Sequence, residues 1–138
     1  MPTITSNPIL PDHRPRTRES AGITMMSAQH HDLVILSVTG TIDVRTAPQL
    51  TDSVTAVLAG RPRALVIDLT DTVFLASAGM SALLAAHASA PTGHFAVVAD
   101  GPSTARPMKL LGLDQTLTIY PTLDSALAEL ADVSEVSA

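Results

Sequence analysis

The sequence contains no cysteine and no tryptophan, and its aromatic residues are limited to Phe74, Phe95 and Tyr120. Without cysteine, disulfide bonds, thiolate catalysis and cysteine-based zinc sites are excluded. Single-stranded nucleic acids are usually bound on aromatic stacking platforms, which so few rings cannot supply. The formal net charge of −5 also gives no basic surface for a phosphate backbone. We therefore expect no direct nucleic-acid partner.

Long apolar runs are absent as well, since no stretch approaches the roughly 20 residues that span a bilayer. Prolines and polar residues interrupt the N-terminal segment, so it lacks the apolar region of a signal peptide. We expect a cytoplasmic protein without a membrane partner. Residues 1–20 are rich in proline and arginine without apolar periodicity, and predict a flexible arm rather than an acidic-partner site. Residues 21–132 are predicted to form one domain, and 133–138 a flexible tail.

Hydrophobic residues make up 46% of the chain, and their spacing alternates between strand and helix patterns. Short apolar runs rich in β-branched residues predict strands at 23–28, 33–38, 64–69, 94–99 and 117–120. The first of these is expected at a sheet edge. Apolar residues at helical spacing predict helices at 47–58, 77–90, 104–111 and 123–131. The alternation predicts an α/β fold, a mixed, mostly parallel sheet of about five strands flanked by about four helices.

No catalytic constellation is recognisable in the sequence. Residues 77–79 (SAG) lack the leading glycine of a nucleophile elbow, and no Walker-type or G-x-G-x-x-G loop is present. His30 and His31 are metal-ligand types, but adjacent histidines point in different directions, so a solvated turn fits better. His87 lies on an apolar helix face and is expected to be partly buried and hydrogen-bonded. We predict no enzymatic activity, no cofactor and no metal.

The most informative segment, residues 73–80, joins an apolar strand to an amphipathic helix through small residues. Such a loop is a standard place for partner contact in open α/β sheets. Ser77 lies there near the free N–H groups of the first helical turn, so it can serve simply as the helix N-cap. Alternatively, it is a phosphorylation switch: the helix N-terminus tolerates the added anion, while a docked partner meets repulsion and a desolvation cost.

Three motifs between about residues 23 and 130 resemble the anti-sigma factor antagonists, the bacterial STAS-domain family. Residues 38–43 (VTGTID), followed by 45–47 (RTA), are similar to that family's T-G-x-[IL]-D-x-x-[TS]-[AS] signature. The strand at 65–69, leading through Phe74 into residues 77–79, is similar to its strand and D-S-[ST]-G switch loop. Residues 110–113 (LLGL) resemble the end of a late helix in these domains.

This resemblance implies a STAS-type fold and, as partner, an anti-sigma factor with a kinase-type ATP-binding domain. The unphosphorylated domain would bind it and free a sigma factor. Phosphorylation of the switch serine, which by alignment is Ser77, would end binding. A monomer is the family-like expectation. The predicted partner-binding residues are Asp43, Thr46, Ala76, Ser77, Ala78, Gly79, Met80 and Ser81. Asp43 has an equally good interpretation as a helix cap.

The chain departs from the family motif at two positions, since Ala76 replaces an aspartate and Ala78 replaces a hydroxyl residue. Losing the acid removes a charge, so kinase recognition or phosphate stability would change while binding persists. An alternative function is a STAS accessory subunit docked on the ATPase of an ABC lipid transporter, because such domains use the same loop region. A nucleotide or small-molecule sensor fits less well, because no basic phosphate cradle is evident.

Overall fold

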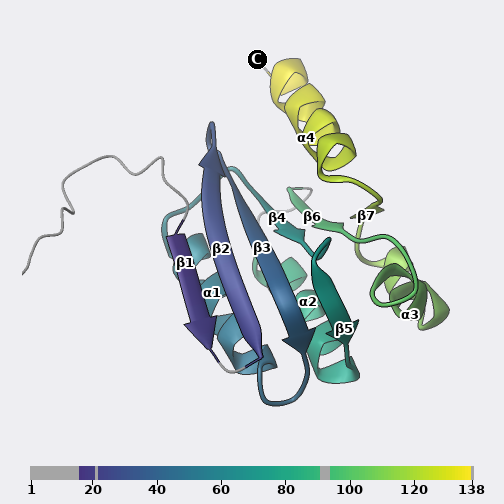
Figure 1. Cartoon of the computed structure of the whole chain (residues 1–138). Coiled ribbons are helices and arrows are strands. Elements are labelled where there is room, and N and C mark those ends of the chain that lie inside the picture. The colour runs from purple at the N-terminus through teal and green to yellow at the C-terminus, as the bar shows by residue number, and fades with distance from the viewer. Residues whose placement is uncertain (1–15, 21, 91–93, 138) are drawn as a thin grey trace, which may run out of the picture.

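The computed structural model describes residues 16–20, 22–90 and 94–137 (Figure 1). Every segment predicted as a strand or helix has the predicted type. In chain order the elements are β1 (Arg16–Ser20), β2 (Ile23–His30), β3 (Leu33–Ile42), α1 (Ala47–Ala59), β4 (Ala64–Asp68), β5 (Thr72–Leu75), α2 (Ser77–Ser89), β6 (Phe95–Val98), α3 (Ala105–Leu110), the 3-10 helix η2 (Leu113–Gln115), β7 (Ile119–Tyr120) and α4 (Leu123–Ser137).

The strands form one seven-stranded sheet in the order β1-β2-β3-β4-β6-β7, with β5 paired to β3 beyond the end of β4. The pairs β1–β2 and β2–β3 are antiparallel, and the other pairings are parallel. The predicted α/β class with a mostly parallel sheet is therefore confirmed. The predicted strand number is too low, because β1 and β5 are absent from the prediction.

Regular elements occupy the described parts of both ends that we predicted to be flexible. Residues 16–20 pair with β2 as strand β1, so β2 is not the edge strand that we expected. Backbone pairing does not require apolar side chains, which explains why the pattern of this polar segment gave no signal. Residues 1–15 of the predicted arm lie outside the described residues. Helix α4 continues to Ser137 because no glycine or proline interrupts it.

Helices pack on both faces of the sheet, although α4 covers only part of its face and leaves β1 and β2 open (Figure 1). Helices α1 and α2 lie together on one face (Figure 1), over a core that includes Ile42, Leu50, Leu65 and Leu83. On the opposite face, Ala126 and Leu130 of α4 belong to a smaller core with alternate residues of β3, β4 and β6. Strand β4 supplies side chains to both cores, so its sequence is an almost unbroken apolar run.

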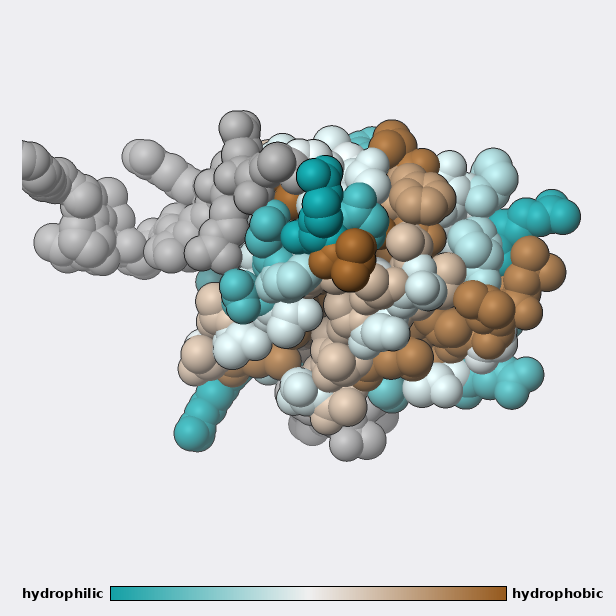
Figure 2. Space-filling view, turned by 90° about the horizontal axis from the view of Figure 1, so that it is seen from below, coloured by the Kyte–Doolittle hydropathy of each residue, from teal (hydrophilic) through white to brown (hydrophobic). Residues whose placement is uncertain are grey.

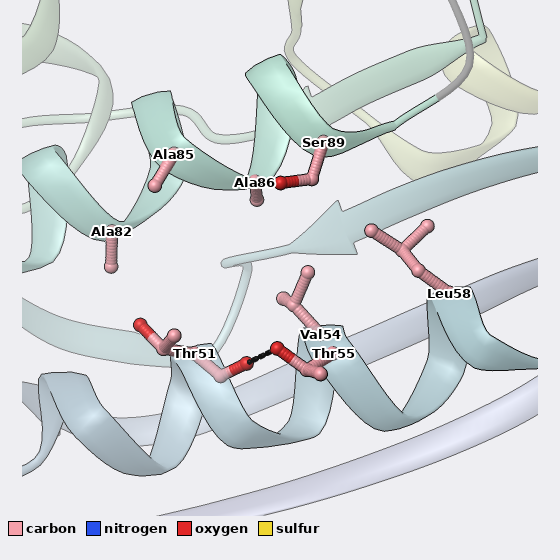
Figure 3. A pocket seen from close by; sticks show the side chains of 8 residues that line it. All are labelled: Thr51, Val54, Thr55, Leu58, Ala82, Ala85, Ala86 and Ser89. Atoms are coloured by element: carbon pink, nitrogen blue, oxygen red, sulfur yellow. Dashed lines mark hydrogen bonds between the residues drawn. The ribbon is translucent and has the colours of Figure 1, made fainter.

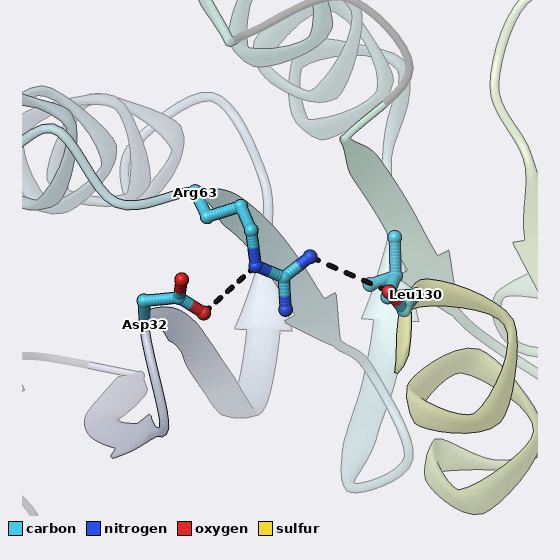
Figure 4. Close-up of polar contacts among 3 residues, drawn as sticks. All are labelled: Asp32, Arg63 and Leu130. Atoms are coloured by element: carbon cyan, nitrogen blue, oxygen red, sulfur yellow. Dashed lines mark hydrogen bonds and ion pairs between the residues drawn. The ribbon is translucent and has the colours of Figure 1, made fainter. Parts of the chain in front are cut away.

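A polar clamp ties α4 to the sheet at the end where β2 turns into β3 (Figure 4). Arg63 Nε lies 2.7 Å from Asp32 Oδ1, and Arg63 Nη1 donates to the Leu130 carbonyl at 3.4 Å. The hydrogen bond from Arg63 holds the pKa of Asp32 below its usual value, against an opposing effect of desolvation. His30 and His31 are exposed at this turn, as predicted, with their rings in edge contact.

Candidate functional site

The candidate site lies where β3 and β5 end and helices α1 and α2 begin. Thr41 pairs with Phe74 and Ile42 with Leu75. The N–H of Ala76 then donates to the Ile42 carbonyl at 2.8 Å. This pairing holds the loop before α1 directly beside the start of α2. The two segments singled out in the sequence, around Asp43 and around Ser77, are therefore brought together by the fold.

The loop before α1 is a turn closed by reciprocal hydrogen bonds between Asp43 and Thr46. The Asp43 N–H donates to Thr46 Oγ1 at 2.8 Å, and the Thr46 N–H donates to Asp43 Oδ1 at 3.1 Å. Thr46 Oγ1 also donates to the Thr41 carbonyl at 2.8 Å. The D-x-x-T spacing thus places each side chain on the other residue's N–H, as in a capping box. The interpretation of Asp43 as the helix cap needs correction, because the N-cap of α1 is Thr46 and Asp43 instead organises the turn that precedes the helix.

Burial and charge differ sharply between these two residues. Thr46 is only 1% exposed, so its side chain cannot touch a partner, and its prediction as a contact residue is corrected. Asp43 is partly exposed. Desolvation acts to raise its pKa, but hydrogen bonds from the N–H groups of Thr46 and Arg45 outweigh it. The pKa of Asp43 therefore lies below its usual value, and its carboxylate stays charged at neutral pH.

Ser77 is the first residue of α2 and not its N-cap. Ala76 occupies the N-cap position, and its carbonyl accepts hydrogen bonds from the N–H groups of Gly79 and Met80. The Ser77 side chain is exposed, and no described residue hydrogen-bonds to its hydroxyl. The capping interpretation of Ser77 is wrong because the helix begins one residue earlier than that interpretation needs. Its hydroxyl is thus accessible.

Gly79 and Met80 face inward and do not belong to the exposed surface. A Cβ on Gly79 would lie 2.6 Å from both Ile42 Cγ2 and Leu75 Cδ1, so glycine lets α2 approach the sheet this closely without displacing these side chains. Met80 is 6% exposed and belongs to the main core. The expectation that these two residues contact a partner is corrected. Ser77 and Ser81 are exposed, and Ala76 and Ala78 are partly exposed.

Three exposed apolar residues beside Ser77 were missing from the predicted site. Val44, Val73 and Phe74 are 75%, 64% and 53% exposed, respectively. Thr72 pairs with Gly40 and Phe74 with Thr41, so Val73 is the extra residue of a β-bulge. The bulge breaks the alternation of β5 and leaves two consecutive apolar side chains at the surface. Figure 2 shows this end of the molecule, where hydrophobic residues lie among polar ones.

A shallow groove of about 60 Å³ lies between α1 and α2 (Figure 3). The side chains that line it are small or apolar: Thr51, Val54, Thr55, Leu58, Ala82, Ala85, Ala86 and Ser89. None of them carries a charge, and the Thr55 hydroxyl donates to the Thr51 carbonyl within α1. This groove holds no group able to transfer a proton or bind an ion.

His87 packs edge-on against Phe95, with ring centroids 5.7 Å apart. Its Nδ1 is buried without a hydrogen-bond partner among the described residues, so the expected hydrogen bond is missing. Within those residues, no three His, Asp or Glu side chains converge as a metal-binding group. Likewise, no described helix has both the length and the hydropathy to cross a membrane.

Comparison with known proteins gives consistent matches. The STAS domain model matches residues 24–126. The anti-sigma-F factor antagonist RsfB of Mycobacterium tuberculosis is 42% identical over 106 residues, which cover 76% of this chain and 87% of RsfB. A crystal structure of an anti-sigma factor antagonist from Mycobacterium paratuberculosis is 44% identical, with a TM-score of 0.76, over 79% of this chain and 94% of its own. Unphosphorylated SpoIIAA, 15% identical, shares the fold with a TM-score of 0.65 over 78% of this chain and 96% of its own.

Proposed function

The chain belongs to the STAS domain family, and on this premise we propose that it is an anti-sigma factor antagonist. In this role it binds an anti-sigma factor with a kinase-type ATP-binding domain and thereby frees a sigma factor. The observation that carries the proposal is the accessible Ser77 hydroxyl at the start of α2, beside the ordered Asp43 turn. Relatives at 42% and 44% identity are named anti-sigma factor antagonists, which favours this function over the transporter alternative.

The geometry at Ser77 supports its role as the phosphorylation switch. A phosphoserine carries about −1.5 to −2 charges. At the first position of α2, the helix dipole and the first-turn N–H groups favour such an anion, so the domain would stay folded. A partner pressed against Ser77 would instead have to dehydrate the phosphate. Phosphorylation therefore releases the partner without unfolding the chain.

The same geometry supports a binding protein and not an enzyme. A nucleophilic serine needs a base within hydrogen-bond reach, and none of the described carboxylates or imidazoles hydrogen-bonds to the Ser77 hydroxyl. Ser77 is thus better suited to receive a phosphoryl group from the partner than to attack a substrate. We propose that the chain acts as a cytoplasmic monomer, without a cofactor and without direct contact with membrane or nucleic acid.

A pull-down with purified tagged chain tests partner and switch together. Wild type should retain a kinase-type anti-sigma factor, and Ser77→Glu should lose it. Ser89→Glu is the matched control, because Ser89 is an exposed serine at the other end of the same helix and should leave binding intact. Recovery of a transporter ATPase in place of an anti-sigma factor would overturn the proposed function.

Incubation of the recovered anti-sigma factor with ATP and the chain tests the modification itself. Phosphate should appear on wild type at Ser77, located by mass spectrometry, and Ser77→Ala should remain unmodified. If wild type binds tightly but stays unmodified, or is modified at a different residue, the switch role of Ser77 is wrong although the binding role stands.

A further inference from the structure

Val44, Val73 and Phe74 are exposed apolar residues on the two segments that meet at the start of α2, and together they are called the ridge below. Phe74 lies on β5 opposite Thr41 of β3, and Val44 is three residues beyond Thr41 in the turn before α1. Ser77 is three residues beyond Phe74. Neighbouring strands lie about 4.8 Å apart, so the turn that carries Val44 and the end of β5 that carries Phe74 both lie within a few residues of Ser77. The family motifs give these side chains no role as contacts, because Val44 occupies an unspecified position of the first motif and Phe74 lies on the stretch that leads to the serine.

The fold does not need this ridge. The side chains that hold β3 and β5 to α2 are Ile42 and Leu75, which are buried, whereas all three ridge side chains are mostly exposed. Single exposed apolar residues are ordinary on protein surfaces. Here a bulge turns two consecutive side chains outward and the adjacent turn adds a third. A cluster of this kind beside a candidate switch marks an interaction surface.

Two acidic residues adjoin the ridge, since Asp43 directly precedes Val44 and the Asp71 carbonyl accepts from the Gly40 N–H at the start of β5. Asp68, level with Ser37 of β3, and Asp100, which follows β6, lie farther away on the same side of the sheet. In the described loops that lead into α1, β5 and α3, Arg45 is the one positively charged residue. Arg106 adds a second positive charge in the first turn of α3. Asp43 and Asp71 therefore put negative charge beside the ridge, which complements a partner with positive charges at the corresponding positions.

We propose that the ridge inserts into an apolar pocket of the anti-sigma factor whose rim carries lysine or arginine side chains. This inference rests on the proposed function and names the part of the surface that anchors the partner. It also gives the release a physical cause. The centre of an apolar contact excludes water, so a phosphate on Ser77 would lose its hydration there, while the positive rim compensates only in part.

The apolar residues of the ridge should affect the dissociation rate, and the acidic residues near it should affect the association rate. Binding kinetics therefore separate the two contributions. The probe is the anti-sigma factor recovered by wild type, purified and immobilised. Phe74→Ser and Val44→Ser should each raise the dissociation rate by about tenfold or more, because both remove an anchor from the centre of the contact. Asp71→Asn combined with Asp100→Asn should instead lower the association rate several-fold at low salt. That difference should vanish near 1 M salt, where the screening length is about 3 Å.

Matched controls are Met26→Ser, an exposed apolar residue on β2, and Glu129→Gln, an exposed acid on α4. Both should bind like wild type. Val44 lies in a turn and is the most exposed of the three, so Val44→Ser keeps the test valid even if Phe74→Ser folds poorly. Wild-type dissociation rates in both ridge variants, with wild type itself binding, would overturn this inference alone. Failure of wild type to bind any anti-sigma factor would overturn the proposed function and, with it, the ridge.

Discussion

Asp43 and Thr46 satisfy each other's backbone at the start of α1: the Asp43 N–H donates to Thr46 Oγ1 at 2.8 Å, and the Thr46 N–H donates to Asp43 Oδ1 at 3.1 Å. The resulting turn carries Val44 and Arg45 outward on its tip. The D-x-x-T part of the family motif is therefore a structural device that presents a surface. Its threonine acts from the interior, and only its aspartate is partly accessible.

Thr46→Val should destabilise the chain by about 1–3 kcal/mol, because it leaves the Asp43 N–H without its hydrogen-bond acceptor and the Thr41 carbonyl without its side-chain donor. Urea unfolding followed by circular dichroism measures this. The control is Thr55→Val, since the Thr55 hydroxyl is exposed and donates only to the Thr51 carbonyl within α1. Equal losses in the two variants would show that the Asp43–Thr46 turn contributes nothing specific.

The lowered pKa of Asp43 predicts a pH-dependent contribution to stability. Because the folded pKa lies below the unfolded value of about 3.9, the contribution is present above that value and is lost as the pH falls through the folded pKa. Wild type should therefore lose more stability between about pH 6 and pH 3 than Asp43→Asn, which cannot titrate at this position. Thermal melts across this range provide the comparison, and parallel curves for the two proteins would contradict it.

Gly79→Ala should destabilise the chain although alanine is the better helix former. The added Cβ would lie 2.6 Å from Ile42 Cγ2 and from Leu75 Cδ1, and overpacking of this kind typically costs about 1–3 kcal/mol. Gly60→Ala is the control, because its Cβ would meet only the Val57 carbonyl at 3.5 Å and its φ of −81° suits any residue. Unfolding midpoints should fall for Gly79→Ala and stay near or above wild type for Gly60→Ala.

The hydrophobic pattern correctly predicts the strands that are buried on both faces. It does not predict a strand whose backbone is bulged. The runs of β4 and β6 predict strands because each faces α1 and α2 on one side and α4 on the other. The sequence pattern of β5 predicts a loop, because the bulge at Val73 removes the alternation that identifies a strand.

Within the site, motif similarity located Asp43 and Ser77 correctly beside each other, but it could not separate exposed residues from buried ones. Gly79 is small because α2 packs on Ile42 and Leu75, and Met80 points into the same core. Both facts depend on how closely the helix approaches the sheet, which a single sequence does not encode as a local pattern. The exposure of Phe74 could not be predicted either, since an apolar residue in such a segment is normally assigned to the core.

Ala76 marks the departure from the family motif, and its place in the structure gives that departure a measurable cost. It is the N-cap of α2, in the extended conformation typical of capping residues, but it has no side-chain acceptor for the first-turn N–H groups. Restoring the acid as Ala76→Asp should stabilise the chain by about 1 kcal/mol in urea unfolding, and Ala76→Asn should stabilise it similarly, since both side chains accept these hydrogen bonds.

The two variants separate capping from charge. Asp also adds a negative charge beside Ser77, close to Asp43, so a recognition role of the acid would make Ala76→Asp a better kinase substrate than both wild type and Ala76→Asn. If instead both variants gain stability and are phosphorylated at the wild-type rate, the family aspartate serves as a helix cap at this position. In that case its loss here weakens the start of α2 and leaves the switch chemistry of Ser77 untouched.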